Sequence, residues 1–349
     1  MSETSIEWTR GDDGSPGKTW NPTRGCSMAR GSELGGCLNC YAARLSARNL
    51  PELKSPTTGE SFARILPSGP RWTGRVELIE HMLGLPIRWK TPRRIFVNSM
   101  SDLFHETLPD EAIDQVFATM AQCPQHTFQT LTKRPERMLR YLNTNHGFDT
   151  RRRVQDVLDS RMERRLANEL IDRWPLPNLW IGTSVENQKT SDLRIPMLLQ
   201  AKAARRFISY EPALSEVDLT EYIRSGLDWQ VCGGESGPSS RPFNVRWALD
   251  AVRQCRGTGC SIFIKQLGMR PYVDYYEAEP LLLGWALSKR YKIVQPDGTA
   301  WKGGGKPMAG ARIEIKLKNK KGGDPTEWFD EIRVRQFPAP ILQPAEALA

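Results

Sequence analysis

The stretch RRIFVNSMSDLFHE, residues 93–106, shows the pattern that decides the fold. It opens with an apolar, β-branched run that suits a buried strand, and a cluster of polar side chains follows that run directly. Five later segments repeat this pattern: residues 126–138, 178–187, 205–214, 227–237 and 260–268. The repetition predicts a series of short strands, each of which ends in polar residues.

Helical periodicity fills most of the intervals between these strands. Apolar residues recur at helical spacing in 110–123 and 245–257, and 193–204 is a third candidate helix. Strands that alternate with helices indicate βαβ units and a parallel sheet. With residues 18–25 as the first strand, the sequence predicts an α/β fold: a partial or full parallel β/α barrel of the TIM type. A doubly wound open sheet is the alternative, because sequence does not show whether the sheet closes.

The predicted barrel spans residues 1–268, with two peripheral insertions. Residues 50–92 are predicted to form a loop, a candidate lid, followed by a helix. Residues 144–176 are rich in arginine at helical spacing, which suits either a nucleic-acid-facing helix or a solvated helix with i,i+4 ion pairs. Residues 269–349 are predicted to be a C-terminal extension that packs on the barrel.

Composition limits the class of protein. The 349 residues include 39% hydrophobic and 26% charged residues, with neither an apolar run of 18 residues nor a signal-peptide pattern at the polar N-terminus. Seven cysteines, an odd number in a chain without an export signal, favour a reducing cytoplasm over a disulfide framework. We therefore expect a cytoplasmic protein with no membrane contact. The net charge of +9 favours a polyanionic partner, namely DNA, RNA or a nucleotide.

The polar residues after the strands form the candidate site. In β/α barrels, side chains at the carboxyl ends of the strands converge on one mouth, where the chemistry takes place. Strand-end capping explains any single residue of this kind, but six strands that end alike favour a shared polar mouth. The residues concerned are Asn98, Ser101, Asp102, His105 and Glu106, then Thr132, Lys133 and Arg134, then Thr183, Ser184 and Glu186, and finally Glu211, Glu235, Ser236, Lys265 and Gln266.

Three cysteines lie together in GCSMARGSELGGCLNCYAARLSARN, residues 25–49. Cys26, Cys37 and Cys40 have the spacing C-x10-C-x2-C, on a glycine-rich segment after the first predicted strand. Three thiolates can hold three irons of a [4Fe–4S] cluster and leave the fourth iron open to a small molecule. A structural zinc site is a second interpretation, although no histidine lies near this loop. Packing of free cysteines as small buried hydrophobes is the third.

Several motifs resemble those of radical S-adenosylmethionine (SAM) enzymes. The cysteine placement is similar to their cluster loop, although the usual spacing is C-x3-C-x2-C and this chain has ten residues in the first interval. SMSDLFHE, LTKRPERMLR and TSVENQKTSDLR resemble motifs of the spore photoproduct lyase branch. The whole chain, with TWNPTRGC, GGESGPSSRP and GGDPTEWFDEIRVRQFP, closely resembles a phage-associated three-cysteine family of unknown function.

The resemblance implies a [4Fe–4S] cluster on the three cysteines, with SAM chelating the open iron. Ser101 and Asp102 would lie near the methionyl amino group, and Lys133 would meet the methionyl carboxylate. Ser184 and Glu186 would approach the ribose, and Asn98 belongs to the same candidate set. The reduced cluster would cleave SAM, and the resulting 5′-deoxyadenosyl radical would take hydrogen from the substrate.

Candidate catalytic residues complete the predicted site. His105 is either an acid–base group or a structural histidine, and Glu235 either presents a carboxylate to substrate or belongs to an ordinary turn. The photoproduct lyases carry a hydrogen-donating cysteine near the second strand, where this chain has none. Cys232 is a candidate donor from another strand, or else a core cysteine. Glu106, Glu211 and Lys265 are the remaining candidates.

Two functions follow from these patterns. The first is a radical SAM enzyme that repairs or modifies a nucleic acid or nucleotide, with an external electron donor and a possible co-encoded protein partner. The second is a non-catalytic nucleic-acid-associated protein with a structural zinc site. Metal content discriminates between them, because a closed zinc site neither absorbs by charge transfer nor responds to SAM.

Overall fold

The computed structural model describes residues 4–32, 35–48, 50–237 and 239–339. The chain divides into two compact units. The first comprises Met1–Ser184, Leu193–Ile208 and Pro338–Ala349, and the second comprises Val185–Asp192 and Ser209–Phe337. Among the described residues, no helix combines the length and the apolar character that crossing a bilayer requires.

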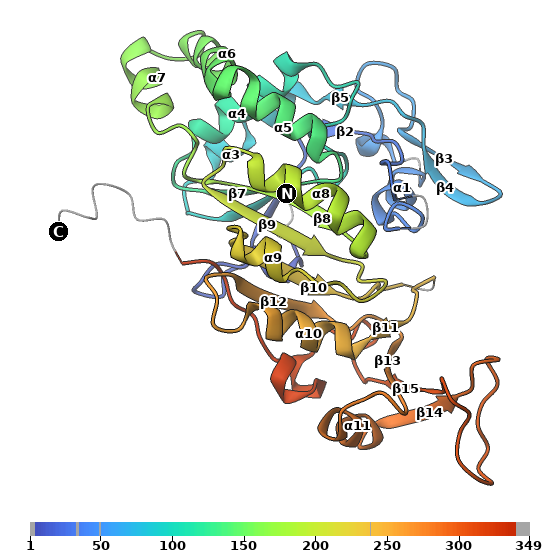
Figure 1. Cartoon of the computed structure of the whole chain (residues 1–349). Coiled ribbons are helices and arrows are strands. Elements are labelled where there is room, and N and C mark those ends of the chain that lie inside the picture. The colour runs from blue at the N-terminus through green and yellow to red at the C-terminus, as the bar shows by residue number, and fades with distance from the viewer. Residues whose placement is uncertain (1–3, 33–34, 49, 238, 340–349) are drawn as a thin grey trace. The chain divides into compact units, whose positions relative to one another are not determined.

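A seven-stranded sheet in the order β1-β6-β7-β8-β9-β10-β12 supplies the framework (Figure 1). Its strands are β1 (Lys18–Trp20), β6 (Arg94–Val97), β7 (Thr127–Thr132), β8 (Leu179–Val185), β9 (Arg205–Tyr210), β10 (Trp229–Gly233) and β12 (Ser261–Gln266). The pairs β1–β6, β6–β7, β7–β8 and β10–β12 are parallel. Each of the seven predicted strand segments therefore contains a strand of this sheet. The strand order is open rather than closed, which agrees with a partial barrel and not with a full one.

Helices of the first unit follow the predicted βα rhythm. They are α1 (Tyr41–Ser46), α2 (Glu80–Leu83), α3 (Leu85–Arg88), α4 (Asp110–Ala121), α5 (Pro135–Asn143), α6 (Phe148–Asp159) and α7 (Arg164–Ile171), and α8 (Gln188–Gln200) spans residues of both units. Helix α4 begins after Pro109 with two acidic residues in its first turn, which favours a helix N-terminus. Its predicted apolar stripe, from Ile113 to Met120, is fully buried. The amphipathic pattern thus places α4 correctly.

An amino-terminal turn completes the core of the first unit. The 3₁₀ turn η1 (Glu7–Thr9) carries Trp8, whose side chain is 3% exposed. Its ring packs edge-on against Phe96, with centroids 4.9 Å apart, and lies 6.1 Å from Phe207. The side-chain amide of Gln129 donates to the Trp8 carbonyl at 3.3 Å. A polar-looking N-terminus therefore supplies a large apolar side chain to strands β6, β7 and β9.

The first insertion differs from the prediction. Residues 50–92 were expected to form a loop and then a helix, but they contain a short turn and a hairpin. The elements are η2 (Pro51–Leu53), the antiparallel pair β3 (Ala63–Leu66) and β4 (Gly69–Trp72), and β5 (Glu77–Leu78), which pairs with β2 (Thr23–Arg24). The expected helix is two short ones, α2 and α3, because Gly84 ends the first and Pro86 starts the second. The second insertion is helical, with η3 (Thr144–Gly147) leading into α6 and α7.

The second unit contains its own small sheet in the order β11-β13-β15-β14. Its elements are α9 (Thr220–Arg224), β11 (Phe243–Asn244), α10 (Val245–Cys255), β13 (Pro271–Asp274), α11 (Pro280–Leu287), β14 (Arg290–Val294), β15 (Arg312–Lys316), η4 (Pro325–Glu327) and η5 (Asp330–Ile332). The side chain of Asn244 caps α10 by accepting from the Arg246 amide. Helix α10 ends at Cys255, and Arg256 is its C-cap residue.

Gly25 is held where a side chain would clash. Its φ is +92°, and a Cβ would lie 2.0 Å from the Arg75 carbonyl oxygen. We expect Gly25→Ala to lower the free energy of unfolding by about 3 kcal/mol or more, since backbone strain and overlap add. Gly74→Ala is the matched control, because Gly74 has a φ of +89° and nothing within 4 Å of its Cβ position. Urea denaturation measures both, and equal losses would contradict the close approach.

Candidate functional site: a cysteine loop held by two buried arginines

The first cysteine lies beside the ends of the parallel strands. It follows Gly25, which forms a bridge with Ser101 in the segment after β6. The Cys26 thiol donates to the Ser27 carbonyl at 3.2 Å. Burial raises the pKa of the Cys26 thiol well above its usual range, and the Asp102 carboxylate raises it further, whereas Arg134 acts in the opposite direction. In this arrangement Cys26 is therefore a neutral thiol.

The other two cysteines lie at the start of α1. Cys40 is the residue immediately before the helix, and both Cys37 and Cys40 are half-buried free thiols. Negative charge on either would raise the pKa of Cys26, so both are within electrostatic range of it. Tyr41 donates its hydroxyl to the Ser99 carbonyl at 2.8 Å, which ties the start of α1 to the segment after β6.

The residue types of the loop suit a metal cluster, whereas the described side chains do not form a site for a single metal ion. Three free thiols on one loop are the ligand set of an iron–sulfur cluster. Within the described residues, however, no three Cys, His, Asp or Glu side chains are close enough together to hold a metal ion. Residues 33 and 34, between the first and second cysteines, lie outside the described part.

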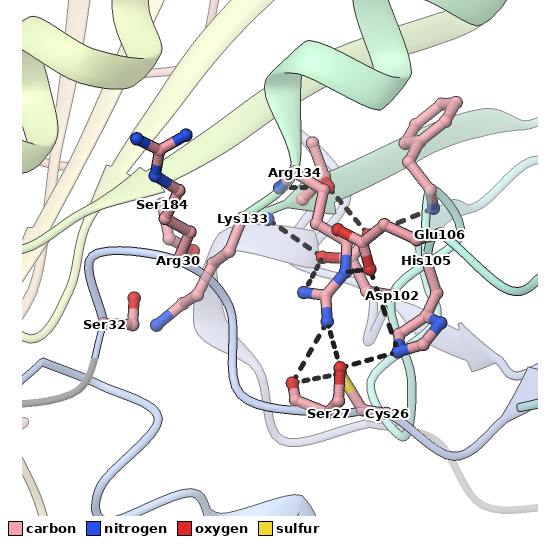
Figure 2. Close-up of polar contacts among 12 residues, drawn as sticks. Cys26, Ser27, Arg30, Ser32, Asp102, His105, Glu106, Lys133, Arg134 and Ser184 are labelled. Carbon is pink, nitrogen blue, oxygen red and sulfur yellow. Dashed lines mark hydrogen bonds and ion pairs between the residues drawn. The ribbon is translucent and has the colours of Figure 1, made fainter. Parts of the chain in front are cut away.

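Arg134 fastens the first half of the loop to the ends of β6 and β7. Its Nη2 donates to the Ser27 hydroxyl at 2.7 Å and to the Ser27 carbonyl at 3.2 Å (Figure 2). Its Nε donates to Glu106 at 2.8 Å, and its Nη1 lies 3.9 Å from Asp102. The side chain is buried, and burial works against its charge, yet the negative groups around it, Asp102 first, raise its pKa. Arg134 is thus a fixed cation beneath the cysteine loop.

Arg194 fastens the next part of the loop to the end of β8. It comes from α8 and is 1% exposed. Its Nη1 donates to the Ser184 carbonyl at 2.7 Å, and its Nη2 donates to the Arg30 carbonyl at 3.1 Å and the Ser32 hydroxyl at 2.7 Å. Five-donor guanidinium groups suit this task, because one side chain bonds three oxygens in two separate chain segments. The loop from Cys26 to Ser32 is therefore fixed at two points.

His105 is a hydrogen-bond donor in this network. The Thr107 amide donates to Nδ1 of His105 at 3.2 Å, so Nδ1 is an acceptor and Nε2 carries the proton. Nε2 lies 2.8 Å from the Ser27 hydroxyl and donates to it. Burial and then Arg134 lower the pKa of His105, which keeps the ring neutral near pH 7. The Ser27 hydroxyl accepts from both His105 and Arg134. Ser27 and His105 therefore do not form a nucleophile–base pair.

Asp102 and Ser101 are occupied by bonds within the protein. Asp102 accepts from the Phe104 amide at 3.0 Å, the Thr132 hydroxyl at 2.7 Å and the Lys133 amide at 2.9 Å. Ser101 bonds the hydroxyl and the carbonyl of Thr23. Asp102 therefore joins the end of β6 to the end of β7, and its backbone partners fix the position of Lys133.

Asn98 carries two energetic costs at one position. It follows β6 directly, with a φ of +62°, which only a few per cent of non-glycine residues adopt. Its side chain is 3% exposed, and its Nδ2 has no hydrogen-bond partner among the described residues. An unpaired buried amide costs about 1–3 kcal/mol. Strain combined with an unpaired donor is typical of residues kept for a ligand.

Lys133 and Ser184 end the neighbouring strands β7 and β8. Figure 2 shows the Lys133 side chain pointing away from Arg134 and toward the loop around Ser32. Ser184 is 5% exposed, and its carbonyl is held by Arg194. The first unit thus brings together the cysteine loop, Asp102, His105 and Glu106, with Lys133 and Ser184 at the adjoining strand ends.

The remaining predicted residues lie in the second unit. Glu211 and Lys265 form an ion pair at 2.6 Å, and both side chains are largely buried. Cys232 is fully buried, and burial, then Glu211, raises the pKa of its thiol. Glu235 accepts from the amide and the Nε of Arg241 at 2.8 and 2.9 Å, so its carboxylate is already paired.

Glu186 has no exposed surface, and its backbone amide bonds the Thr190 hydroxyl. Within this unit the structure brings Glu211, Lys265 and Cys232 together, while Glu235 has its own partner.

Sequence reasoning missed Ser27 and Arg194, and it gave Arg134 no role beyond its place among the strand-end residues. Arg134 was one of several strand-end residues, and Arg194 was only the last letter of the TSVENQKTSDLR motif. A signal existed, since an arginine ends the TSVENQKTSDLR motif, which follows the fourth predicted strand. Its contacts, however, reach residues more than 160 positions away in sequence.

Comparisons with solved structures give distant matches to spore photoproduct lyase. A mutant of that enzyme matches with 10% identity and a TM-score of 0.36 over 95% of this chain and 75% of the other. The lyase complexed with dinucleoside spore photoproduct matches with 12% identity and a TM-score of 0.31, over 89% and 70% of the two chains. Likeness of this degree fixes neither the fold nor the activity of this chain. No curated protein matches it.

The family model for DUF5131, "Protein of unknown function", matches residues 3–316, which is most of the chain. This agrees with the unknown-function family expected from the motifs, while the association with phages stays a prediction. The chain belongs to the DUF5131 family.

Proposed function

We propose that this protein is a radical SAM enzyme. Cys26, Cys37 and Cys40 hold a [4Fe–4S] cluster, and SAM chelates the iron that lacks a thiolate. One observation carries the proposal: two buried arginines, Arg134 and Arg194, fasten the cysteine loop across the carboxyl ends of β6, β7 and β8. This edge of a parallel sheet is where β/α folds place their chemistry.

The first half of the loop is suited to holding a cluster ligand. It is fixed at Ser27 and Ser32, so Cys26 is held in place before a cluster binds. Metal ligation requires the thiolate, so cluster binding would release the proton of the Cys26 thiol. When bound, the cluster supplies the electron that cleaves SAM.

We assign roles to the residues around the loop by the chemistry of their side chains. Lys133 offers an ammonium to the methionyl carboxylate, Asn98 offers its unpaired Nδ2, and Ser184 offers its hydroxyl at the end of β8. Asp102 has most of its lone pairs filled, so it positions Lys133 rather than binding SAM directly. Ser101 positions the start of the loop through its bonds to Thr23 and its bridge with Gly25. His105 and Glu106 hold Ser27 and Arg134 in place.

In the second unit, the Glu211–Lys265 pair is the candidate for proton transfer to or from substrate, because a buried carboxylate–ammonium pair can exchange a proton. Cys232 beside it is a candidate hydrogen donor, Glu186 a candidate ribose contact, and Glu235 a positioning residue through Arg241. The substrate is a nucleic acid or nucleotide, supported by the basic charge and the lyase-like motifs. An external donor supplies the electron.

Asn98→Gly separates ligand binding from stability. The variant relieves the positive φ and removes the unpaired amide, so we expect stability to be unchanged or raised by about 1 kcal/mol. SAM affinity of the cluster-loaded protein should fall about tenfold, the effect of one lost hydrogen bond. Asn145→Gly is the control, because Asn145 has a φ of +48° but is exposed. Equilibrium dialysis with SAM decides: unchanged affinity in Asn98→Gly contradicts the assignment.

Metal analysis tests the function itself. A radical SAM enzyme purified and reconstituted without oxygen should hold about four irons per chain. Stoichiometric zinc would instead support a structural metal site on the same thiols.

A further inference from the structure

The charge of this protein is concentrated in one short segment. Residues 289–321 carry ten Lys and Arg against two acidic residues, a net charge of +8. The other 316 residues balance 39 basic against 38 acidic side chains. The basic character of the whole chain, +9, therefore comes almost entirely from β14, β15 and the loops that adjoin them.

Strand register places several of these cations on one face of the small sheet. Arg290 lies opposite Lys316, and Lys292 lies opposite Glu314. Alternate residues on a strand share a face and repeat about every 6.7 Å. The opposite face is apolar, because Ile293, Ile313 and Ile315 are buried. We call the exposed cationic side of β14 and β15, together with the turn at 318–321, the basic face.

One carboxylate on the basic face, that of Glu314, lies among three cations. Glu314 is 2.8 Å from Lys292, 2.8 Å from Arg312 and 3.6 Å from Arg270. Partial burial works against its charge, but bonds from Lys292 and Arg312 lower the pKa of Glu314. Three cations on one carboxylate leave two positive charges uncompensated. The cluster is therefore built to retain positive charge rather than to cancel it.

The turn after β15 presents more cations from a fixed backbone. The amides of Lys318 and Asn319 donate to the Glu327 carboxylate at 2.7 and 2.9 Å. The indole of the buried Trp328 donates to the Gly322 carbonyl at 2.9 Å. Lys318, Lys320 and Lys321 are exposed. No carboxylate among the described residues lies within salt-bridge distance of their ammonium groups. A rigid turn that exposes three ammonium groups loses little entropy on binding.

The arginine-rich helices α6 and α7 differ in this respect. Residues 144–176 hold seven arginines against six acidic residues. Arg151 pairs with Asp172 at 2.6 Å, and Arg165 pairs with Glu169 at 3.3 Å. Of the two interpretations of this segment, the structure supports the solvated helix with ion pairs. Its charges are cancelled locally and offer little to a polyanion.

We propose that the basic face is the surface that binds the phosphate backbone of a nucleic acid. The inference rests on the proposed function for its substrate class and adds where that substrate is held. Rows of cations on a flat strand pair suit the regular charges of a phosphate backbone, which give affinity without sequence readout. An anionic membrane is the other polyanion, but surface insertion needs apolar side chains beside the cations. Five of the six strand positions of this face are filled by Arg290, Lys292, Arg312, Glu314 and Lys316, and the sixth, Val294, is buried.

Fluorescence anisotropy with labelled oligonucleotides tests the proposal on the full chain without cluster or SAM. Single-stranded DNA, duplex DNA and single-stranded RNA are the probes, each at 50 and 200 mM salt. We expect at least one to bind, with affinity that falls tenfold or more between the two salt concentrations, because several phosphates release counterions. Lys318→Glu/Lys320→Glu should weaken binding at least about tenfold.

The matched control is Arg164→Glu/Arg165→Glu, which changes net charge by the same amount on exposed side chains of α7. It should weaken binding no more than about threefold, and both double variants should unfold at the wild-type temperature. Equal losses in the two variants would overturn the proposal, because general charge would then explain binding. Binding to phosphatidylserine vesicles with none to oligonucleotides would overturn it as well. This binding assay uses protein without a cluster. A negative result for the basic face is therefore distinct from a negative result for the cluster assignment.

Discussion

Cys26→Ala should remove the iron from this protein. In the wild type we expect about four irons and four sulfides per chain after anaerobic reconstitution, and less than one iron in the variant. The reason is geometric: Cys26 is the ligand already fixed in position, next to Ser27 and its two donors, His105 and Arg134. Cys37→Ala and Cys40→Ala should give the same loss.

Cys123→Ala is the matched control for thiol removal. Cys123 is a buried free thiol whose pKa is raised to about 12 by burial, and it lies between α4 and β7, away from the loop. It should keep the full iron content. Iron retained at wild-type level in Cys26→Ala would contradict the ligand assignment, and iron lost equally in Cys123→Ala would show that the cysteine variants merely unfold.

Arg194→Met should destabilise the first unit and release the loop. The substitution leaves the carbonyls of Ser184 and Arg30 without their buried donor, and hydrogen bonds from a charged group contribute about 1.5–3 kcal/mol each. Part of this is offset, since methionine does not bury a charge. We expect the free energy of unfolding to fall by about 3 kcal/mol. Urea denaturation of the iron-free protein measures this directly.

The same variant should change the loop locally. With Ser32 no longer held, limited proteolysis should cut the segment between Cys26 and Cys37 at least tenfold faster. Arg165→Met is the control, because that side chain is 87% exposed and pairs with Glu169, four residues along the same helix. Its stability should change by less than about 0.5 kcal/mol. If Arg194→Met and Arg165→Met behave alike, Arg194 does not hold the loop.

The strands of the large sheet were predictable because each carries its own local signal. An apolar run such as IFV, followed by Asn98, marks both the strand and its end without reference to the rest of the chain. The β3–β4 hairpin was missed although Pro67 and Gly69 mark a turn between two short extended runs. Only one of its eight strand residues, Ala63, is buried, so the strands lack the apolar pattern that identified the others.

The candidate site was predictable only in part, for a related reason. Sequence spacing identifies the cysteines and the strand-end residues, but it does not show which hydrogen bonds they form. The bond from Arg134 to Ser27 spans 107 positions, and the bond from Arg194 to Ser32 spans 162. Which arginine is buried under which loop depends on the strand order. Sequence alone also could not show that Asp102 and Glu235 already have partners.

The central claim is that the cysteine loop holds a cluster with one iron open to SAM. Electron paramagnetic resonance of the reduced, reconstituted protein, recorded with and without SAM, tests it most directly. We predict a [4Fe–4S]⁺ signal that shifts when SAM is added, because SAM binds the open iron. A cluster signal that is indifferent to SAM, or a protein that takes up zinc and no iron, would contradict it.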